Sequence, residues 1–129
     1  MELVRVPTLT QDVPYAYAAI SPGGTVYAAG ACPLDGAGAV VAPGDVARQT
    51  AQVMANLEES LRAAGSGFHD VLKTTVYVAS SDRDDLVAAW NGVRAAFGKH
   101  DAPSTLLGVS VLGYPDQLVE VEAVAVRPG

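Results

Sequence analysis

The stretch VEVEAVAV, residues 119–126, limits the possible folds more than any other part of the chain. Side chains alternate across a β-strand, so this stretch has two different faces. One face is small and apolar throughout and consists of Val119, Val121, Ala123 and Ala125. The other face mixes carboxylates with aliphatic groups and consists of Glu120, Glu122, Val124 and Val126. The pattern predicts a strand in a sheet with one fully covered face and one face of mixed character.

Two segments repeat apolar residues at spacings of three and four, which is the period of an amphipathic helix. The first spans about residues 46–64, with the stripe Val46, Thr50, Val53, Met54, Leu57 and Leu61. The second spans about residues 82–99, with the stripe Leu86, Trp90, Val93 and Phe97. Each helix has one apolar side, so both are expected to pack on the small apolar face of the sheet.

The ends of both helices carry residues that favour capping. Asp45 can accept a free backbone N–H at the start of the first helix. Gly65 can end that helix in the left-handed conformation that glycine adopts without strain. Ser81 with Asp84 resembles a capping box at the start of the second helix.

Six further segments, rich in Val, Tyr, Thr and Ile or in alternation, are expected to be strands. They span residues 2–6, 14–20, 24–31, 71–79, 105–112 and 117–127. The order is then β-β-β-α-β-α-β-β, within a single domain of residues 1–129. This order predicts an α+β fold in which two helices pack on one face of a mixed sheet.

The opposite face of the sheet is expected to be too apolar for open solvent and too charged for an ordinary core. In VLKTTVYV, the residues that suit the helix-covered face are Leu72, Val76 and Val78, and those on the opposite face are Lys73, Thr75 and Tyr77. Two helices cannot cover both faces, so we expect a subunit interface that contains polar clefts. The alternative is a solvated amphipathic face with partly exposed valines.

Composition excludes several classes of protein. The net charge is −6 and only eight Lys and Arg are present, so nucleic acid is not an expected partner. No run of 18 apolar residues and no signal-peptide pattern occurs, so no membrane association is expected. Cys32 is the single cysteine, which fits a reducing cytoplasmic setting. No Cys, His and Asp spacing indicates a metal, and no glycine pattern indicates a nucleotide or other cofactor.

Four segments together resemble the RidA family, also called YjgF or endoribonuclease L-PSP-like proteins. They are VPY at 13–15, the Gly-rich loop and helix at 29–65, DVLKTTVYV at 70–78, and VEVEAVAV at 119–126. The resemblance implies a chorismate-mutase-like fold and a homotrimer with three clefts between subunits. It also implies hydrolysis of reactive imines and enamines, such as 2-aminoacrylate, to a keto acid and ammonia.

The sequence departs from the family pattern at the residues that bind the substrate. The family arginine that clamps the substrate carboxylate falls on Thr105 or Ser104, depending on the alignment, and no arginine occurs from 101 to 126. The family Ser-Gly-Gln reads Ala-Gly-Ala at 29–31, and a family asparagine falls on Trp90. Hydroxyl groups can orient a ligand, but they do not neutralise its charge.

The candidate catalytic residue is Glu120, which matches the family glutamate proposed to position or activate water. A carboxylate in a cleft can move protons between water and nitrogen, and the alternative is a structural glutamate at the subunit seam. The candidate substrate-binding residues are Tyr15, Gly30, Ala31, Ser104, Thr105 and Trp90. Their alternatives are interface packing for Tyr15, close strand packing for Gly30, local backbone hydrogen bonds for the two hydroxyls, and core packing for Trp90.

The first functional hypothesis is therefore hydrolysis of a small imine, enamine or related carbonyl compound by addition of water. The missing arginine suggests a substrate less anionic than 2-aminoacrylate. A non-catalytic homotrimer that binds a small molecule is the alternative. Ribonuclease activity is a third hypothesis, which the acidic composition and the absence of paired histidines disfavour.

Overall fold

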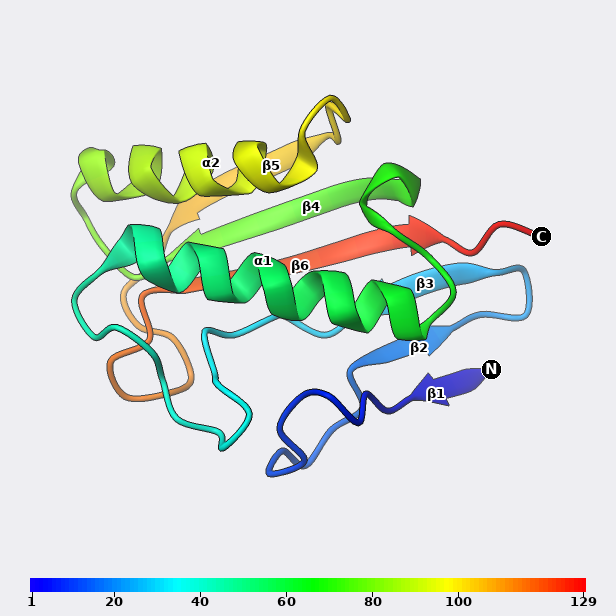
Figure 1. Ribbon diagram of the computed structural model, residues 1–129. Helices are drawn as coiled ribbons and strands as arrows, with labels where there is room; N and C mark the ends of the chain where they lie inside the picture. The colour runs from blue at the N-terminus through cyan, green and yellow to red at the C-terminus, as the bar shows by residue number, and fades with distance from the viewer.

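A computed structural model describes residues 1–129 as a sheet covered on one side by two helices (Figure 1). The helices are α1, Val46–Ala63, and α2, Arg83–Phe97, and a short 3-10 turn, η1, spans Phe68–Asp70. The strands are β1 Glu2–Val4, β2 Ala18–Ile20, β3 Thr25–Ala28, β4 Val71–Val78, β5 Ser104–Gly108 and β6 Val119–Val126. The predicted α+β order of elements is confirmed.

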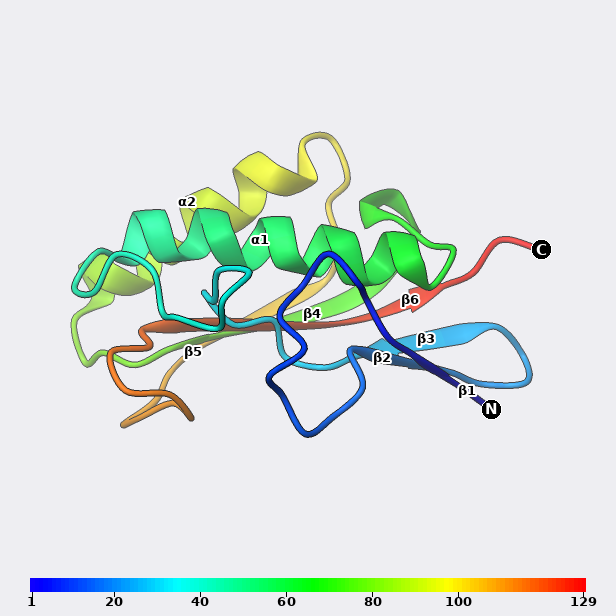
Figure 2. The ribbon, with the colours of Figure 1, turned by 60° about the horizontal axis from the view of Figure 1, so that its bottom comes forward.

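The six strands form one mixed sheet in the order β1-β2-β3-β6-β4-β5. Only β4 and β5 are parallel, and α2 connects them. Both helices lie on the same side of this sheet (Figure 2). The opposite side, which includes Thr75, Tyr77, Glu120 and Glu122, is called the helix-free face below.

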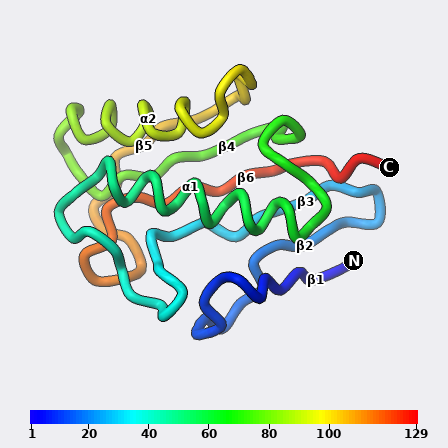
Figure 3. The backbone as a smooth tube through the Cα atoms, in the orientation of Figure 1, coloured from blue at the N-terminus to red at the C-terminus, as the bar shows by residue number.

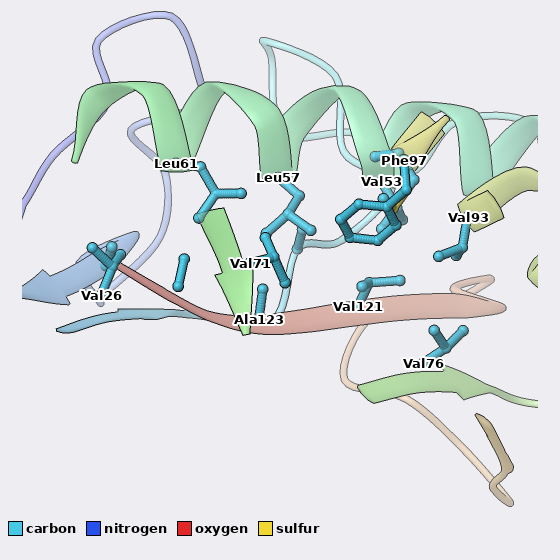
Figure 4. Close-up of a cluster of buried hydrophobic side chains, with 14 of the residues drawn as sticks. Val26, Val53, Leu57, Leu61, Val71, Val76, Val93, Phe97, Val121 and Ala123 are labelled. Atoms are coloured by element: carbon cyan, nitrogen blue, oxygen red, sulfur yellow. The ribbon is translucent and has the colours of Figure 1, made fainter. Parts of the chain in front are cut away.

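The core fills the space between the helices and the sheet (Figure 4). From β6 it takes the four small residues that alternation predicted, Val119, Val121, Ala123 and Ala125, each at most 3% exposed. Val53, Leu57 and Leu61 of α1 and Val93 of α2 are fully buried against them. The sequence pattern thus identified the covered face correctly, and Glu120 consequently lies on the other one.

The expected caps of α1 are present. The Asp45 carboxylate accepts the Arg48 backbone N–H at 3.0 Å. At the other end Gly65 has φ of 78°, and the Ser66 N–H reaches back to the Leu61 carbonyl at 2.8 Å, which is a Schellman motif. The start of α2 differs from the expectation, because Asp82, not Ser81, accepts the Asp84 N–H.

Several strands are shorter than the sequence indicated. The expected strand 14–20 is regular only at Ala18–Ile20. The Tyr17 backbone still bonds to Val4 and Ala29, but residues 14–16 form an irregular segment outside the ladder. The expected strand 24–31 ends at Ala28, and residues 29–32 bend along β6 instead. The expected strand 105–112 is shifted to Ser104–Gly108.

One residue assigned to the core is exposed. Leu72 is 51% exposed, whereas Val71 beside it is 3% exposed. The register between β4 and β6 skips from Val71 to Lys73, so a β-bulge turns Leu72 outward and Val71 inward. The assignment of Leu72 to the helix-covered face was therefore wrong.

The chain trace places the two termini at one end of the sheet (Figure 3). At the other end lie the start of α1 and the loops before it and before β6 (Figure 3). The buried Gln49 of α1 ties these loops together, donating to the Asp116 carbonyl at 2.9 Å and accepting the Leu118 N–H at 2.8 Å. Neither helix is long and apolar enough to cross a membrane.

Candidate active site

Glu120 lies at the start of β6, at the end of the sheet where the loops gather, and its half-buried side chain is on the helix-free face. One carboxylate oxygen, Oε1, accepts two hydrogen bonds. The Cys32 thiol donates at 3.2 Å and the Gln117 side-chain amide at 3.1 Å. The other oxygen, Oε2, accepts no hydrogen bond within the chain and is not sealed from solvent.

The segment 29–32 reaches Glu120 because it continues antiparallel to β6 after β3 ends. The Ala31 N–H donates to the Val121 carbonyl at 2.7 Å, and the Val121 N–H returns to the Ala31 carbonyl at 3.2 Å. Gly30 then lies directly against the Glu120 side chain. A Cβ at position 30 would lie 2.7 Å from Cδ of Glu120 and closer still to Oε2. Only glycine leaves room for the carboxylate in this position.

Tyrosines form the wall opposite Gly30. The Tyr15 and Tyr114 hydroxyls are hydrogen-bonded at 3.2 Å. The rings of Tyr15 and Tyr17 pack edge to face with centroids 6.3 Å apart. Burial, and then the hydrogen bond with Tyr114, raise the pKa of Tyr15 far above its usual value. The phenol therefore stays protonated at neutral pH and can donate a hydrogen bond to a ligand.

These groups surround an open hollow of about 510 Å³, called the Glu120 cleft below. It is lined by Pro14, Tyr15, Ala29, Gly30, Cys32, Gly113, Tyr114 and Glu120, with no lysine or arginine among them. Burial, and then the nearby Glu120 carboxylate, raise the pKa of Cys32 to about 12. A protonated thiol is a poor nucleophile, so the cleft offers one carboxylate base and several neutral donors.

The structure places the predicted site residues in two groups. Tyr15, Gly30 and Glu120 line the Glu120 cleft, and Ala31 lies beside them in a smaller pocket behind it. Ser104 and Trp90 line a separate pocket of about 100 Å³ at the C-terminal end of α2, together with Arg94 and His100. That pocket is on the helix side of β5.

Ser104 and Thr105 are consecutive on β5 and therefore point to opposite faces of the sheet. The Ser104 hydroxyl faces the core side, where it bonds with the Thr74 hydroxyl and donates to the Ala102 carbonyl. Thr105 is on the helix-free face, where its hydroxyl accepts a hydrogen bond from the Lys73 ammonium at 2.6 Å. The side chain at position 105 thus shares a sheet face with Glu120, and the side chain at position 104 does not.

Thr105 nevertheless lies far from Glu120 within one chain. In the sheet, Glu120 is opposite Tyr77, whereas Thr105 is opposite Thr75. β5 is two strands from β6, about 10 Å away, and the offset of two residues adds about 7 Å along the strand. The separation is about 12 Å, which exceeds the span of a three-carbon substrate.

Sequence reasoning missed three residues that surround Glu120. They are Cys32, Gln117 and Tyr114. Cys32 was used only as an indication of a reducing setting. Gln117 was placed at the start of the expected strand 117–127, which begins at Val119 in the structure, and Tyr114 lies in a loop without periodicity. No pattern in the sequence indicates that these side chains meet, because the contact depends on how loops 29–45 and 109–118 fold over one end of the sheet.

The comparisons with known proteins agree with the fold. The family model described as Endoribonuclease L-PSP matches residues 8–127. A RutC family protein of Pyrococcus horikoshii is 36% identical over 115 residues, covering 88% of this chain and 87% of that protein. A Mus musculus protein named 2-iminobutanoate/2-iminopropanoate deaminase is 34% identical over 104 residues, covering 80% of this chain and 74% of that protein. The crystal structure of the E. coli YjgF gene product matches with a TM-score of 0.84 at 28% identity, covering 99% of this chain and 100% of that one.

Proposed function

The chain belongs to the endoribonuclease L-PSP family, also called the RidA family, and we propose that it hydrolyses a small imine or enamine by addition of water. The observation that supports this function best is the Glu120 carboxylate, held by two donors in a cleft with one oxygen left open. The mouse relative named as an imine deaminase supports the same class of reaction.

The reaction needs one group that moves protons in both directions. In the proposed reaction, Glu120 accepts a proton from water as the water oxygen bonds to the imine carbon and the C=N bond becomes a single bond. Glu120 then returns this proton to the nitrogen, which gives the neutral carbinolamine. In the collapse Glu120 takes the proton of the carbinol hydroxyl and passes it to the departing nitrogen, while the C–N bond breaks and the C=O bond forms. Ammonia leaves, and the carboxylate is ionised for the next cycle.

The tyrosines can contribute hydrogen bonds that bind the substrate. A neutral phenol that stays protonated can donate a hydrogen bond to the substrate, and Tyr15 lies on the wall facing Gly30. The cleft contains no cation, so it suits an imine without a negative charge close to the reacting carbon. Net charge of −6 and a cleft without lysine or arginine both disfavour RNA as the substrate.

We expect the complete site to form between copies of the chain, as a homotrimer. Glu120 and Thr105 share the helix-free face but lie about 12 Å apart in one chain, so one small ligand cannot contact both unless the second comes from a neighbour. The helix-free face also leaves Tyr27 54% and Leu107 42% exposed. Burial of such large apolar groups by a second copy would stabilise an oligomer.

The test generates imines enzymatically and measures how fast they are hydrolysed. An amino-acid oxidase supplies 2-imino acids and an amine oxidase supplies neutral imines, with semicarbazide present as a competing trap. The wild-type protein should accelerate release of ammonia, more strongly with neutral imines, and Glu120→Gln should reduce the acceleration by at least 100-fold. A matched surface variant, Glu58→Gln, should retain full activity.

Three outcomes would contradict the proposal. Saturable binding of small carbonyl compounds without any acceleration would favour a non-catalytic binding protein. A monomeric mass at micromolar concentration, measured by light scattering, would contradict the shared cleft. Cleavage of RNA that persists in the Glu120→Gln variant would point to a different site altogether.

A further inference from the structure

We propose that Cys32 and Gln117 are positioning residues. Both donate hydrogen bonds to Oε1 of Glu120, so that only Oε2 exchanges protons with water and substrate. This inference rests on the function proposed above and concerns how the same site works. It follows from two donors meeting on one oxygen of the carboxylate while the other oxygen has none. In this proposal both residues act through Glu120, because each donates to its carboxylate.

The Gln117 amide has only one possible orientation. Gln117 is buried, and its Oε1 accepts the Tyr114 backbone N–H at 3.2 Å. Its Nε2 donates to the Val119 carbonyl at 3.1 Å and to Glu120 at 3.1 Å. Exchanging the amide oxygen and nitrogen would place acceptor against acceptor at Val119 and at Glu120. The side chain is therefore fixed as a donor to the carboxylate.

The Cys32 thiol is fixed by a different set of contacts. The Asn56 amide on α1 donates to the backbone carbonyls of Cys32 and Leu34, both at 2.9 Å, and so holds the loop against the helix. The thiol itself is almost completely buried and lies 3.2 Å from Oε1. Because burial keeps this thiol protonated, it donates its hydrogen to the carboxylate.

The position of the other carboxylate oxygen, Oε2, is limited by Gly30. Oε2 lies over Gly30, so the carboxylate cannot rotate toward the 29–32 segment. Two donors stabilise negative charge on Oε1 and lower its ability to take a proton. A proton from water is therefore expected on Oε2, the oxygen that is open to the cleft.

Among the titratable groups that face Glu120, Glu122 is the one other carboxylate. Cys32 comes from the 29–32 segment, Tyr15 from the segment before β2, Tyr114 from the 109–118 loop and Tyr77 from the neighbouring β4. Glu122, two residues further along β6, is bonded to the Tyr77 hydroxyl at 2.8 Å. The acidic side of the pH–rate profile should therefore respond to loss of either donor.

The experiment compares variants that differ only in the donor at position 32. Cys32→Ser keeps a hydroxyl donor, Cys32→Ala removes it, and Cys32→Val removes it while filling the space so that water cannot replace it. We expect Cys32→Ser to retain kcat/KM within about three-fold. Cys32→Val and Gln117→Leu should each lower kcat/KM about ten-fold, equivalent to roughly 1.4 kcal/mol, and move the acidic limb of the pH–rate profile to higher pH.

A measurement independent of turnover separates this inference from the proposed function. With ¹³C-labelled glutamate, the Glu120 carboxyl resonance at neutral pH should have a different chemical shift in Cys32→Val than in Cys32→Ser, because only the serine variant keeps a donor to Oε1. If the protein shows no imine hydrolysis but this difference is observed, the function is wrong and the positioning is supported. The same chemical shift in both variants, with Cys32→Val folded as judged by its thermal midpoint, would overturn the inference even if hydrolysis is confirmed.

Discussion

Replacing Gly30 with alanine should damage the site without damaging the fold. The backbone at Gly30 is not in the left-handed region, so alanine can adopt its conformation. The added methyl carbon would lie 2.7 Å from Cδ and 2.9 Å from Cγ of Glu120, and nearer still to Oε2. Ordinary van der Waals contact begins near 3.4 Å, so the carboxylate must move by about 1 Å or rotate away.

That movement determines the magnitude of the effect. Both hydrogen bonds on Oε1 have lengths just above 3 Å, so a shift of about 1 Å breaks them. Misplacing a catalytic group by about 1 Å lowers the rate on the order of 100-fold. The stability cost should be about 1 kcal/mol or less, because the obstructing atoms belong to the end of a flexible, half-buried side chain that can turn toward the open cleft.

The assay compares Gly30→Ala with Gly23→Ala, whose added carbon would meet no atom closer than 4.0 Å. Imine hydrolysis, thermal midpoint and oligomeric mass are measured for both. We expect a loss of about 100-fold in kcat/KM for Gly30→Ala, full activity for Gly23→Ala and similar thermal midpoints. Activity of Gly30→Ala within two-fold of wild type would refute the assignment of Glu120 as the proton-transfer group.

Three further predictions concern stability. Gly92→Ala should destabilise the fold by about 1 kcal/mol in chemical denaturation. The added Cβ would lie 2.6 Å from the Thr50 methyl on α1. The resulting overpacking costs roughly 1–3 kcal/mol, which exceeds the gain in helix propensity of about 1 kcal/mol. Gln49→Leu should cost about 2–4 kcal/mol in urea, because it removes the fully buried amide that pairs with the Leu118 N–H and the Asp116 carbonyl. For Cys32, the folded pKa of about 12 lies above the unfolded value of 9.0, so the protonated thiol contributes stability below pH 9 that is lost as the pH rises toward 12. Wild type should therefore lose more free energy of unfolding than Cys32→Ala over this range, and equal losses would contradict the assignment.

The fold could be predicted from the sequence because its main constraint is periodic. Alternation in 119–126 identified the buried face of β6, and spacings of three and four identified both helices within two residues of their ends. The errors lie where periodicity is broken by geometry that the sequence does not express. The bulge at Leu72 changes which residue of β4 points inward, and residues 14–16 leave the ladder although their sequence is strand-like.

The site was predictable only in part, for a related reason. Glu120 follows from strand alternation together with the family resemblance, and Gly30 follows from its match to the glycine of the family Ser-Gly-Gln. Cys32 and Gln117 come from loops, whose conformation depends on long-range contacts such as those of Asn56 with the Cys32 carbonyl. Sequence patterns describe neighbours along the chain and across regular elements, so they do not reveal contacts between two irregular segments.

The proposed roles of Glu120 and Thr105 depend on different departures from the family resemblance. Glu120 has the surroundings that its proposed role needs, because Cys32 and Gln117 donate to Oε1 and Gly30 leaves room for the carboxylate. Thr105 lies where the resemblance predicts an anion-binding arginine, and its hydroxyl accepts a hydrogen bond from the Lys73 ammonium. A neutral hydrogen bond of about 1 kcal/mol in place of a charge-assisted one of about 1.5–3 weakens carboxylate binding by roughly one or two kcal/mol. Because the loss falls on binding and not on proton transfer, the difference from imine deaminases that clamp a carboxylate should appear in KM and in substrate choice, with kcat on the best substrate preserved.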